Sequence, residues 1–491
     1  MKVRPASLKL TATASLLALT ALAAPARADD LREALAAAYN TNPSLENARA
    51  TKRANDENVP ITRAQGLPTL DVTATHIEFL RQSANAFTAP ERNLGVTAAL
   101  VVPIYSGGAV RNNLAAAKER VEANEADLRN VESSLFAQVV AAYMDVLRTE
   151  ALVALVTNQV QVLRTNLEAT SDRFEIGDLT ITDVAQSRSR LALAEGDLQT
   201  AEANLINARE TYIRLVGQAP GELEAPPPLP GLPDTVGQAI VTALENNPAL
   251  DAARQRAEAA GFDTKTAGAG RLPTVALFSN GQYSDFYGTL GGPVAAQFRQ
   301  AETTANAGVR VTIPIFQGGL PAARQRQAGA RETAALEDVI LNERQVIADT
   351  RATYAGWQAA NGVIKSAQAA VEAAELSLEG LRAENSIGNR QILDVLNGEQ
   401  ELVQARAQLV TARRNAYVAG FNLLVLMGKA EARDLNLDVG GPLYDPTINS
   451  DRVSSKMNDW DRDPEPAAKS TRTVDIPPAT ATIGPQLLPG E

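Results

Sequence analysis

The stretch Pro103–Gly108, PIYSGG, recurs as Pro314–Gly319, PIFQGG, at an offset of 314 − 103 = 211 residues. Five further short matches flank these motifs, three of them at offset 211 and two at offset 205. One length change of 211 − 205 = 6 residues therefore aligns the two halves, and we interpret the chain as an internal duplication. The matched pairs are Asn42–Leu45 with Asn247–Leu250, Leu67–Thr69 with Leu272–Thr274, Ile176–Gly177 with Ile387–Gly388, Asp183–Val184 with Asp394–Val395, and Leu215–Gly217 with Leu426–Gly428.

Alternating hydrophobicity runs through each of the two motifs and the residues before it. The even positions of 94–104 are apolar and the odd positions are mostly small or polar, a period of two that predicts a β-strand. Pro103 and Pro314 should end the strand ladder, since proline has no amide proton to donate. We expect strands at about 67–80 and 94–105 in the first half and at about 272–285 and 305–316 in the second. The glycines expected to permit the bend from strand to helix are Gly107, Gly108, Gly318 and Gly319.

Heptad spacing follows each glycine pair. In the first half apolar residues fall seven apart over 114–135, shift by four, and continue in steps of seven to Phe174. This pattern predicts a long coiled-coil helix that turns back at Gly177, and the second half turns back at Gly388. An opening helix and a returning helix are together about as long as one long helix, roughly 100 Å. We expect long helices over about 108–216 and 319–428, and opening helices from Asp30 to about Gly66 and from Thr235 to about Gly270.

The N-terminus has the features of a secretory signal peptide. Basic residues precede an apolar stretch over 10–24, and Ala26–Ala28 is a small-residue cleavage site. Removal of residues 1–28 would leave 491 − 28 = 463 residues. The leader carries four basic residues, so the formal net charge would change from −11 to −11 − 4 = −15. Such a charge argues against nucleic acid as a partner.

The composition excludes several kinds of site. The chain contains no cysteine and one histidine, His76, so disulfides, thiol catalysis, zinc–thiolate sites and a lipid anchor through cysteine are ruled out. We assign no catalytic residue, no metal and no cofactor. Hydrophobic residues make up 45% but aromatic residues only 4%, so the interior must consist largely of Ala, Leu and Val, which suits long packed helices.

The repeats, a proline-rich joint and a polar C-terminal tail divide the chain. The tail is rich in proline and polar residues, and we expect it to be disordered. The expected segments are the signal peptide 1–28, the first repeat 29–220, the Pro-rich linker 221–233, the second repeat 234–432 and the tail 433–491.

Four strands per chain limit how the protein could cross a membrane. A ten-residue strand can cross a bilayer, but about eight strands are needed to close a barrel. Open sheet edges are not viable in lipid. If the strands span a membrane, several copies of the chain must therefore close the barrel together.

The duplicated layout, the two strand-exit motifs and the two helix turns resemble the TolC family of outer-membrane efflux and type I secretion channels. The turns are Arg173–Gly177 (RFEIG) and Asn385–Arg390 (NSIGNR), and the resemblance extends to about Gly428. It implies a mainly α fold with a membrane β-barrel, in which three chains build one β-barrel and one α-barrel. It also implies an outer-membrane protein of a Gram-negative bacterium that crosses the periplasm as a passive exit duct for efflux or type I secretion. The implied partners are two further copies of the chain, outer-membrane lipid, a periplasmic adaptor protein and an inner-membrane exporter, either proton-driven or ATP-driven (ABC).

The resemblance also implies a gate at the periplasmic end, where the helices turn. By motif, Asp394 matches an acidic ring and Arg390 a linking arginine, whose partners would be Asp183 and Thr182. The chain departs from the family at two positions: Asn397 replaces a second acidic residue and Asn385 an aromatic one. The asparagine at position 397 argues against strong block by divalent cations, since one ring of carboxylates binds cations less firmly than two. The residues expected to contact the adaptor are Ile176, Gly177, Asp178, Leu179, Ile387, Gly388 and Asn389.

Three other functions fit the sequence less well. A periplasmic adaptor also has long helical hairpins, but adaptors carry one hairpin in a β-rich module, and the duplication argues against this alternative. A secreted enzyme is disfavoured because no nucleophile–histidine–acid set, metal cluster or nucleotide-binding motif is present. A diffusion porin would need many alternating strands in one chain, whereas most of this chain has helical patterns.

Overall fold

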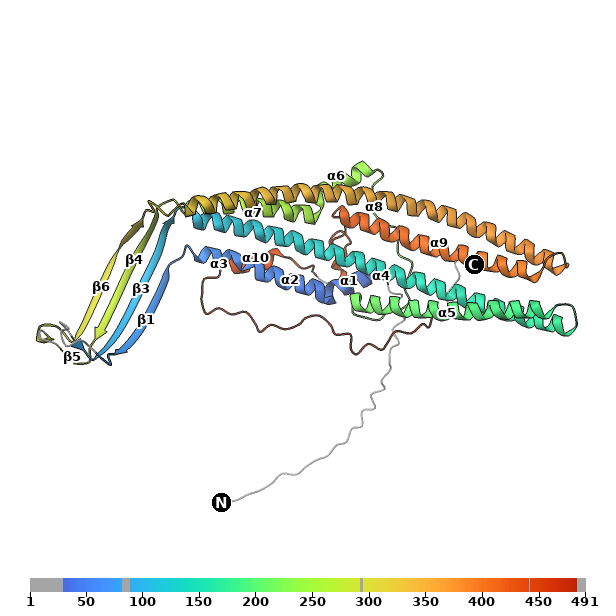
Figure 1. The fold of residues 1–491 in the computed structure, drawn as a ribbon, viewed down its shortest axis with the longest axis horizontal. Helices are drawn as coiled ribbons and strands as arrows, with labels where there is room; N and C mark the ends of the chain where they lie inside the picture. The colour runs from blue at the N-terminus through green and yellow to red at the C-terminus, as the bar shows by residue number, and fades with distance from the viewer. Residues whose placement is uncertain (1–29, 82–88, 292–294, 441, 484–491) are drawn as a thin grey trace, which may run out of the picture.

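The computed structural model describes residues 30–81, 89–291, 295–440 and 442–483. The expected signal peptide, 1–28, lies outside the described residues. The described chain is elongated, with a sheet at one end and two helical hairpin turns at the other (Figure 1). The order of short helices, strand pair, long helix and shorter returning helix occurs twice along the sequence.

Four strands form one antiparallel sheet in the order β1-β3-β4-β6. They are β1 (Thr69–Glu78), β3 (Arg92–Ser106), β4 (Thr274–Asp285) and β6 (Ala301–Thr312). At the far end of the sheet, β2 (Ala89–Pro90) pairs with β5 (Leu290–Gly291), followed by the short 3₁₀ turn η1 (Ala295–Gln297). The β3–β4 pairing joins the two halves of the chain, and β1 and β6 form the edges.

The register gives the sheet one apolar and one polar face, because directly paired residues share a face. One row contains Val102, Leu277 and Val309, and the neighbouring row on the same face contains Leu70 and Leu100. The opposite face carries three rows that are mostly polar, beside a row with Val101 and Phe278. These rows are Asp71, Ala99, Asn280 and Asn306, then Thr73, Thr97, Gln282 and Thr304, then Thr75, Gly95, Ser284 and Glu302.

The two prolines behave differently from one another. Strand β6 covers 301–312, so it starts and ends four residues before the expected 305–316, and Pro314 lies beyond its end as expected. Pro103, in contrast, does not end the ladder, and that expectation was wrong. The register of the β3–β4 pairing shifts between Pro103 and Tyr105, and the pairing continues to Ser106. A bulge of this kind absorbs a residue that cannot donate to the ladder.

Two helices of 67 residues each, α4 (Ala109–Glu175) and α8 (Leu320–Ser386), run the length of the molecule. They return as α5 (Ile181–Val216) and α9 (Ile392–Leu426). Both long helices start after a glycine with φ of 82°, Gly108 and Gly319, preceded by a glycine that also has positive φ. Only glycine adopts this left-handed conformation without strain, which explains the pairs at the strand-to-helix bends.

The opening helix of each half is interrupted, which corrects the expectation of continuous helices. The first half has α1 (Leu31–Thr41), α2 (Pro43–Asp56) and α3 (Asn58–Ala64), and the second has α6 (Val236–Asn246) and α7 (Pro248–Ala269). Both halves break at an Asn-Pro pair. Proline cannot donate the interior helical hydrogen bond but is favoured at a first helical position.

The asparagine of each pair joins two helix ends. Asn42 Oδ1 accepts from the Ser44 amide at the start of α2, and its Nδ2 donates to the Leu215 carbonyl in α5 at 2.8 Å. Asn247 does the same for α7, and its Nδ2 donates to the Leu426 carbonyl of α9 at 2.9 Å. The start of α2 is thereby held against the end of α5, and the start of α7 against the end of α9.

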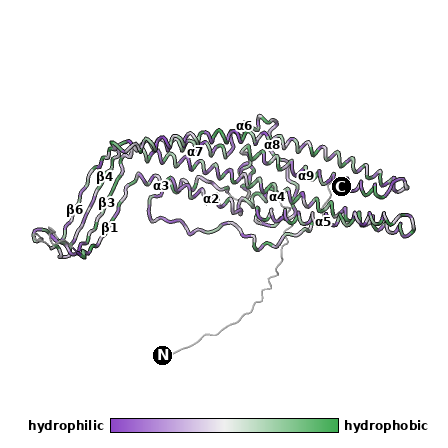
Figure 2. The backbone as a smooth tube through the Cα atoms, in the orientation of Figure 1, coloured by the Kyte–Doolittle hydropathy of each residue, from purple (hydrophilic) through white to green (hydrophobic). Residues whose placement is uncertain are grey.

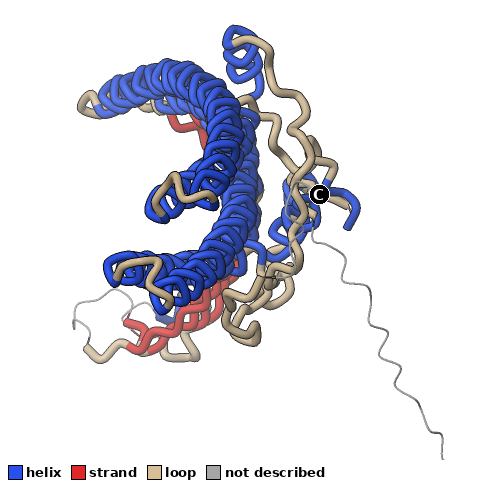
Figure 3. The backbone as a smooth tube through the Cα atoms, turned by 90° about the vertical axis from the view of Figure 1, so that its right-hand side faces the viewer, coloured by secondary structure: helices blue, strands red, loops and turns tan. Residues whose placement is uncertain are grey.

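The helices pack side by side in a curved layer. Helix α4 contacts α2, α3 and α5 along one side and α7 and α9 along the other, while α8 contacts α7 and α9. Seen along the long axis, they form an open arc, and loop segments lie on its convex side (Figure 3). The largest buried cluster lies at mid-length and includes Phe136, Tyr143 and Tyr212. The proline-rich linker packs there too, since the Tyr143 hydroxyl donates to the Glu224 carbonyl at 2.7 Å.

Part of the C-terminal tail folds against the rest of the chain, contrary to the expectation of disorder for 433–491. It forms η2 (Leu437–Gly440) and α10 (Thr447–Ser454), and both Leu437 and Val453 are buried. Such sparse apolar residues cannot make a core of their own, but here they dock onto a surface that α1, α2 and α3 already provide. The last eight residues, 484–491, lie outside the described residues.

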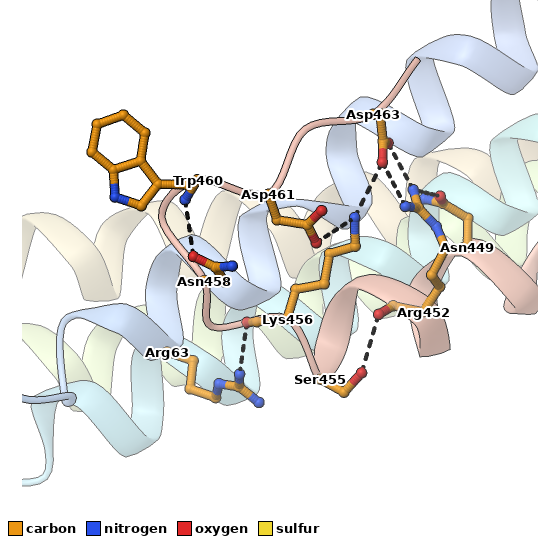
Figure 4. A network of polar contacts seen from close by, with 9 residues as sticks. All are labelled: Arg63, Asn449, Arg452, Ser455, Lys456, Asn458, Trp460, Asp461 and Asp463. Atoms are coloured by element: carbon orange, nitrogen blue, oxygen red, sulfur yellow. Dashed lines mark hydrogen bonds and ion pairs between the residues drawn. The ribbon is translucent and has the colours of Figure 1, made fainter.

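Polar contacts hold the tail in place (Figure 4). Asn449 donates to the buried Asp56 of α2 at 2.7 Å. Within the tail, Arg452 pairs with Asp463 at 2.7 Å and Lys456 with the same carboxylate at 3.1 Å. The hydrogen bonds from these two cations lower the pKa of Asp463 below its usual range.

None of the described helices combines the length and hydropathy needed to cross a bilayer. Polar and apolar residues are mixed along both long helices (Figure 2).

Candidate functional site: the two hairpin turns

Both hairpins end in turns of similar structure. Gly177 and Gly388 have φ of 81° and 79°, and each turn is closed by an amide that reaches back into the long helix. Asp178 donates to the Arg173 carbonyl at 2.9 Å, and Asn389 to the Glu384 carbonyl at 3.0 Å. The glycines thus allow helix ends in which a residue beyond the last turn satisfies a free carbonyl.

The tips expose apolar side chains. Ile176 is 81% exposed and Ile387 is 70% exposed. Among the other residues expected to contact an adaptor, Gly177, Asp178, Gly388 and Asn389 are exposed and Leu179 is half-buried. Single exposed apolar residues are common on protein surfaces, so the contact of these tips with an adaptor stays a prediction.

Asp183 serves its own helix start. Its carboxylate accepts from the Thr180 amide at 2.9 Å and from the Thr180 hydroxyl at 2.7 Å, and the hydroxyl accepts from the Asp183 amide. These hydrogen bonds form a capping box and lower the pKa of Asp183. Thr182, between them, is exposed.

Arg390 pairs within its own turn. Its Nε lies 2.7 Å from Glu384 Oε2, and the hydrogen bond and charge of Glu384, with the charge of Asp394, raise the pKa of Arg390. Asn385 donates to the Arg390 carbonyl at 2.8 Å and so braces the turn. Within the described chain no ion pair joins Arg390 to Asp183.

Asp394 lies in the first turn of α9 and is half-buried. A helix N-terminus favours an acidic residue at this position.

A contact that the sequence reasoning missed lies next to this turn. Arg190 of α5 donates from Nη2 to Asn397 Oδ1 at 2.8 Å and from Nη1 to Gln400 Oε1. Asn397 was expected in the gate, but Arg190 was not. The partners are 207 and 210 residues apart in sequence, and no local pattern marks such a pair.

A second missed residue is Glu399, only 4% exposed. Its two carboxylate oxygens accept from Asn166 Nδ2 of α4 at 3.3 and 3.2 Å, and it pairs with Arg382 of α8 at 3.2 Å. A hollow of about 410 Å³ opens beside it between the hairpins. Within the described residues no group of three or more His, Asp or Glu side chains is placed to hold a metal ion.

The family model described as "Outer membrane efflux protein" matches residues 34–218 and 239–429. The two matched segments contain both strand pairs and both hairpins. The chain belongs to the outer membrane efflux protein family. This efflux protein is 31% identical to "Outer membrane efflux protein BepC" of Brucella suis over 88% of this chain and 92% of the relative. It is 26% identical to "Outer membrane protein TolC" of Escherichia coli over 85% of this chain and 86% of the relative.

The fold is also similar to a solved channel. The crystal structure of the Campylobacter jejuni CmeC outer membrane channel superposes with a TM-score of 0.72 at 16% identity, covering 87% of this chain and 90% of that one. Family membership establishes that this efflux protein is an outer-membrane exit duct extending into the periplasm and not a periplasmic adaptor. Members of the family are passive channels.

Proposed function

We propose that three copies of this efflux protein close into one continuous conduit, gated where the hairpins turn. The observation that carries the proposal is the shape of one chain: an open arc of helices attached to a sheet whose two edges, β1 and β6, have no partner in the described chain (Figure 3). Three such sheets joined edge to edge give 3 × 4 = 12 strands, enough for a closed barrel.

The two faces of the sheet suit a barrel in lipid. The apolar face, with Leu70 and Val72 each 67% exposed in the single chain, would contact the acyl chains. The polar face, with Asn280 and Gln282, would line the lumen. Pairing of β6 with β1 of the next copy would satisfy the free amide and carbonyl groups of both edges, which lipid cannot do.

The gate would lie at the opposite end of the conduit. Arg390 would leave or share Glu384 to link with Asp183 and Thr182 of a neighbouring copy, while three Asp394 carboxylates would form a ring that favours cations. Asn385 would hold the Arg390 turn in shape, and Asn397 would leave a second ring uncharged. Exposed ion pairs contribute about 0–1 kcal/mol each, so three copies hold the closed state by only a few kcal/mol.

Partners would supply that small energy. A periplasmic adaptor that covers the tips at Ile176 and Ile387 would bind an open arrangement more tightly than the closed one and so shift the population. The adaptor would connect the duct to an inner-membrane exporter, driven by protons or by ATP.

The test is conductance of the purified, detergent-extracted protein in a planar bilayer. We expect a small, steady conductance for the wild type and a larger one for the double variant Asp183→Ala/Arg390→Ala. Asp394→Ala should weaken cation selectivity without abolishing conduction. Equal conductance of wild type and double variant would place the gate elsewhere, and a monomeric native mass in detergent would contradict the trimer.

A further inference from the structure

The tail that follows α9 is bound to the first half of the chain through its own backbone. The matched family segments end at residue 429, so this tail lies beyond them. Lys52 of α2 donates to the Pro446 carbonyl. Arg63 of α3 donates to the carbonyls of Ser454 and, at 3.2 Å, of Lys456. Because these bonds go to main-chain oxygens, they fix the path that the tail follows along α2 and α3.

The tail also completes a buried cluster on α1 and α2. The guanidinium carbon of Arg49 lies between two rings, 4.3 Å from the centroid of Tyr39 and 5.0 Å from that of Tyr444 in the tail. Lys52 and Asp56 pair at 3.0 Å and are only 2% and 1% exposed. Buried charges are stable only when they keep their partners, and the tail supplies some of these partners. The structure beneath the tail therefore determines where the tail lies.

The part of the tail that Arg63 holds lies near the root of the sheet. Gly66 follows α3 and is so close to α4 that a Cβ there would be 2.9 Å from Val110 Cγ1. Val110 is the second residue of α4, so α3 ends beside the bend from strand to helix. Arg63 precedes Gly66 by three residues, about 5 Å along a helix. Its hydrogen bond to Lys456 thus brings the tail within reach of one arginine side chain from this level.

Beyond Lys456 the tail makes a loop that exposes apolar side chains. Trp460 is 83% exposed and Met457 is 71% exposed. The Trp460 amide donates to Asn458 Oδ1 at 3.1 Å, and the indole ring projects from the loop away from Lys456 (Figure 4). Helix α3 adds Ile61, which is 61% exposed. A tryptophan ring, apolar except for one N–H group, prefers the boundary between lipid and water.

The charges of this loop are balanced. Residues 452–463 contain three basic and three acidic side chains, so their net charge is 3 − 3 = 0. Lys456 pairs with Asp461 at 3.0 Å and with Asp463 at 3.1 Å. Arg452 pairs with Asp463 at 2.7 Å. A loop without net charge is not repelled by an anionic membrane surface.

We propose that the loop 457–461 is an interfacial anchor, in which Trp460 inserts into the headgroup region of the periplasmic leaflet of the outer membrane. The inference rests on the proposed barrel, since that barrel puts the bend from strand to helix at this edge of the membrane. Loop segments lie on the convex side of the helical arc, which faces outward in a closed conduit and away from the pore (Figure 3). The anchor would fix how deeply the barrel sits in the membrane.

The chain has only two tryptophans, which makes the anchor directly measurable. Trp357→Phe leaves Trp460 as the only tryptophan. Trp460→Phe leaves Trp357 as the matched control, because it lies 357 − 319 = 38 residues beyond Gly319, about 57 Å along α8 from the bend.

The measurement is tryptophan emission of the full-length protein in phosphatidylcholine vesicles. The lipids carry bromine atoms, which quench tryptophan, either near the headgroup or deep in the acyl chains. We expect Trp460 to lose emission in both brominated lipids, and to lose more with the shallow bromines. Trp357 should keep its emission in both.

A third protein with a single tryptophan separates the anchor from the barrel on which it rests. Val72→Trp in the Trp357→Phe/Trp460→Phe background places an indole on the apolar face of β1, where deep bromines should quench it. Quenching at position 72 but not of Trp460 would leave the barrel standing and overturn the anchor. Quenching at neither position would overturn both. Quenching of Trp460 alone would support the anchor and refute the assignment of the sheet to lipid.

Contact with a neighbouring copy of the chain would give a different pattern. Trp460 would then be protected from iodide in the water phase and unaffected by brominated lipid, and that result would overturn the anchor. Quenching by iodide without quenching by bromine, as for a ring left in water, would overturn it equally.

Discussion

Glu132 of α4 shows how a single side chain responds to the tail that covers it. Its Oε1 accepts from the Ala432 amide at 2.6 Å. Burial raises the pKa of Glu132, and the nearby Glu431 carboxylate adds to the rise, while the hydrogen bond from Ala432 opposes it. The chain segment after α9 is thus held at a carboxyl group whose charged form is disfavoured.

We predict that Glu132→Gln changes the pH dependence of stability. Because the pKa is raised in the folded state, the folded protein binds this proton more tightly than the unfolded chain does. The stabilising contribution is complete below about pH 4.3, the ordinary glutamate pKa, and is lost as the pH rises through the raised value. The melting temperature of the wild type, relative to that of Glu132→Gln, should therefore rise as the pH falls from 7 to about 4. A difference that stays constant with pH would contradict the raised pKa.

At the scale of helices, the Asn-Pro pairs determine how short elements match long ones. Asn42 and Asn247 each end one helix, cap the next and bond a carbonyl of a returning helix. In each half, two shorter helices can then pack end to end along one long helix, because the asparagine forms hydrogen bonds with free backbone groups at their junction. The continuous opening helix expected from the sequence could not have made this junction, because an unbroken helix offers no free amide to cap.

We predict that Asn42→Ala costs about 2 kcal/mol, from about 1 for the cap and about 1 for the bond to the Leu215 carbonyl. Asn42→Ser keeps a capping oxygen but is too short to reach Leu215, so it should lose about half as much. The shift of the chemical denaturation midpoint measures both. Equal midpoints for the serine and alanine variants would argue against the cap.

At the scale of the whole molecule, one chain forms an open sheet and an open arc of helices. The paired strands β3 and β4 bring the two halves together, and the outer strands β1 and β6 each have one edge without a strand partner in the described chain. The barrel proposed above is based on this geometry, and it would place one face of the sheet against lipid.

The two faces give a direct test of that placement. Val72 and Thr73 are adjacent in β1 but belong to opposite faces, paired with Ala98 and Thr97. Val72→Arg should cost about 2–4 kcal/mol per chain at the bilayer midplane and reduce the yield of folded trimer, whereas Thr73→Arg should be tolerated in the lumen. The fraction of trimer that survives unheated in detergent gels measures the yield. An equal loss in both variants would contradict the assignment of the faces.

Much of the fold could be predicted because its signals are local. The period of two in 94–104 and the heptads after Gly108 produced strands and helices close to the observed bounds. Pro103 was misjudged because a bulge depends on how the partner strand pairs, which its own sequence does not show. The tail was misjudged because its few apolar residues are sufficient only when α1, α2 and α3 already offer a surface.

In the candidate site, too, local features could be predicted from the sequence and contacts between distant helices could not. The turns at Gly177 and Gly388 were visible as helix-breaking residues, and motif resemblance indicated Asp183, Arg390 and Asp394. Two of the observed partners are local, since Asp183 bonds Thr180 three residues away and Arg390 bonds Glu384 six residues away. The contact of Arg190 with Asn397 spans 207 residues and was not visible in the sequence. Side-chain pairing depends on which helices become neighbours, and for distant helices that is a property of packing.

The amino-acid sequence by itself thus specified the duplicated order of elements, the lengths of the long hairpin helices and the family, because periodicity, glycine and proline act over a few residues. Packing of the folded chain decided the free edges of the sheet, the docking of the tail and the contacts between hairpins. Those features depend on residues hundreds of positions apart, which meet only after two 67-residue helices have aligned the halves of the molecule.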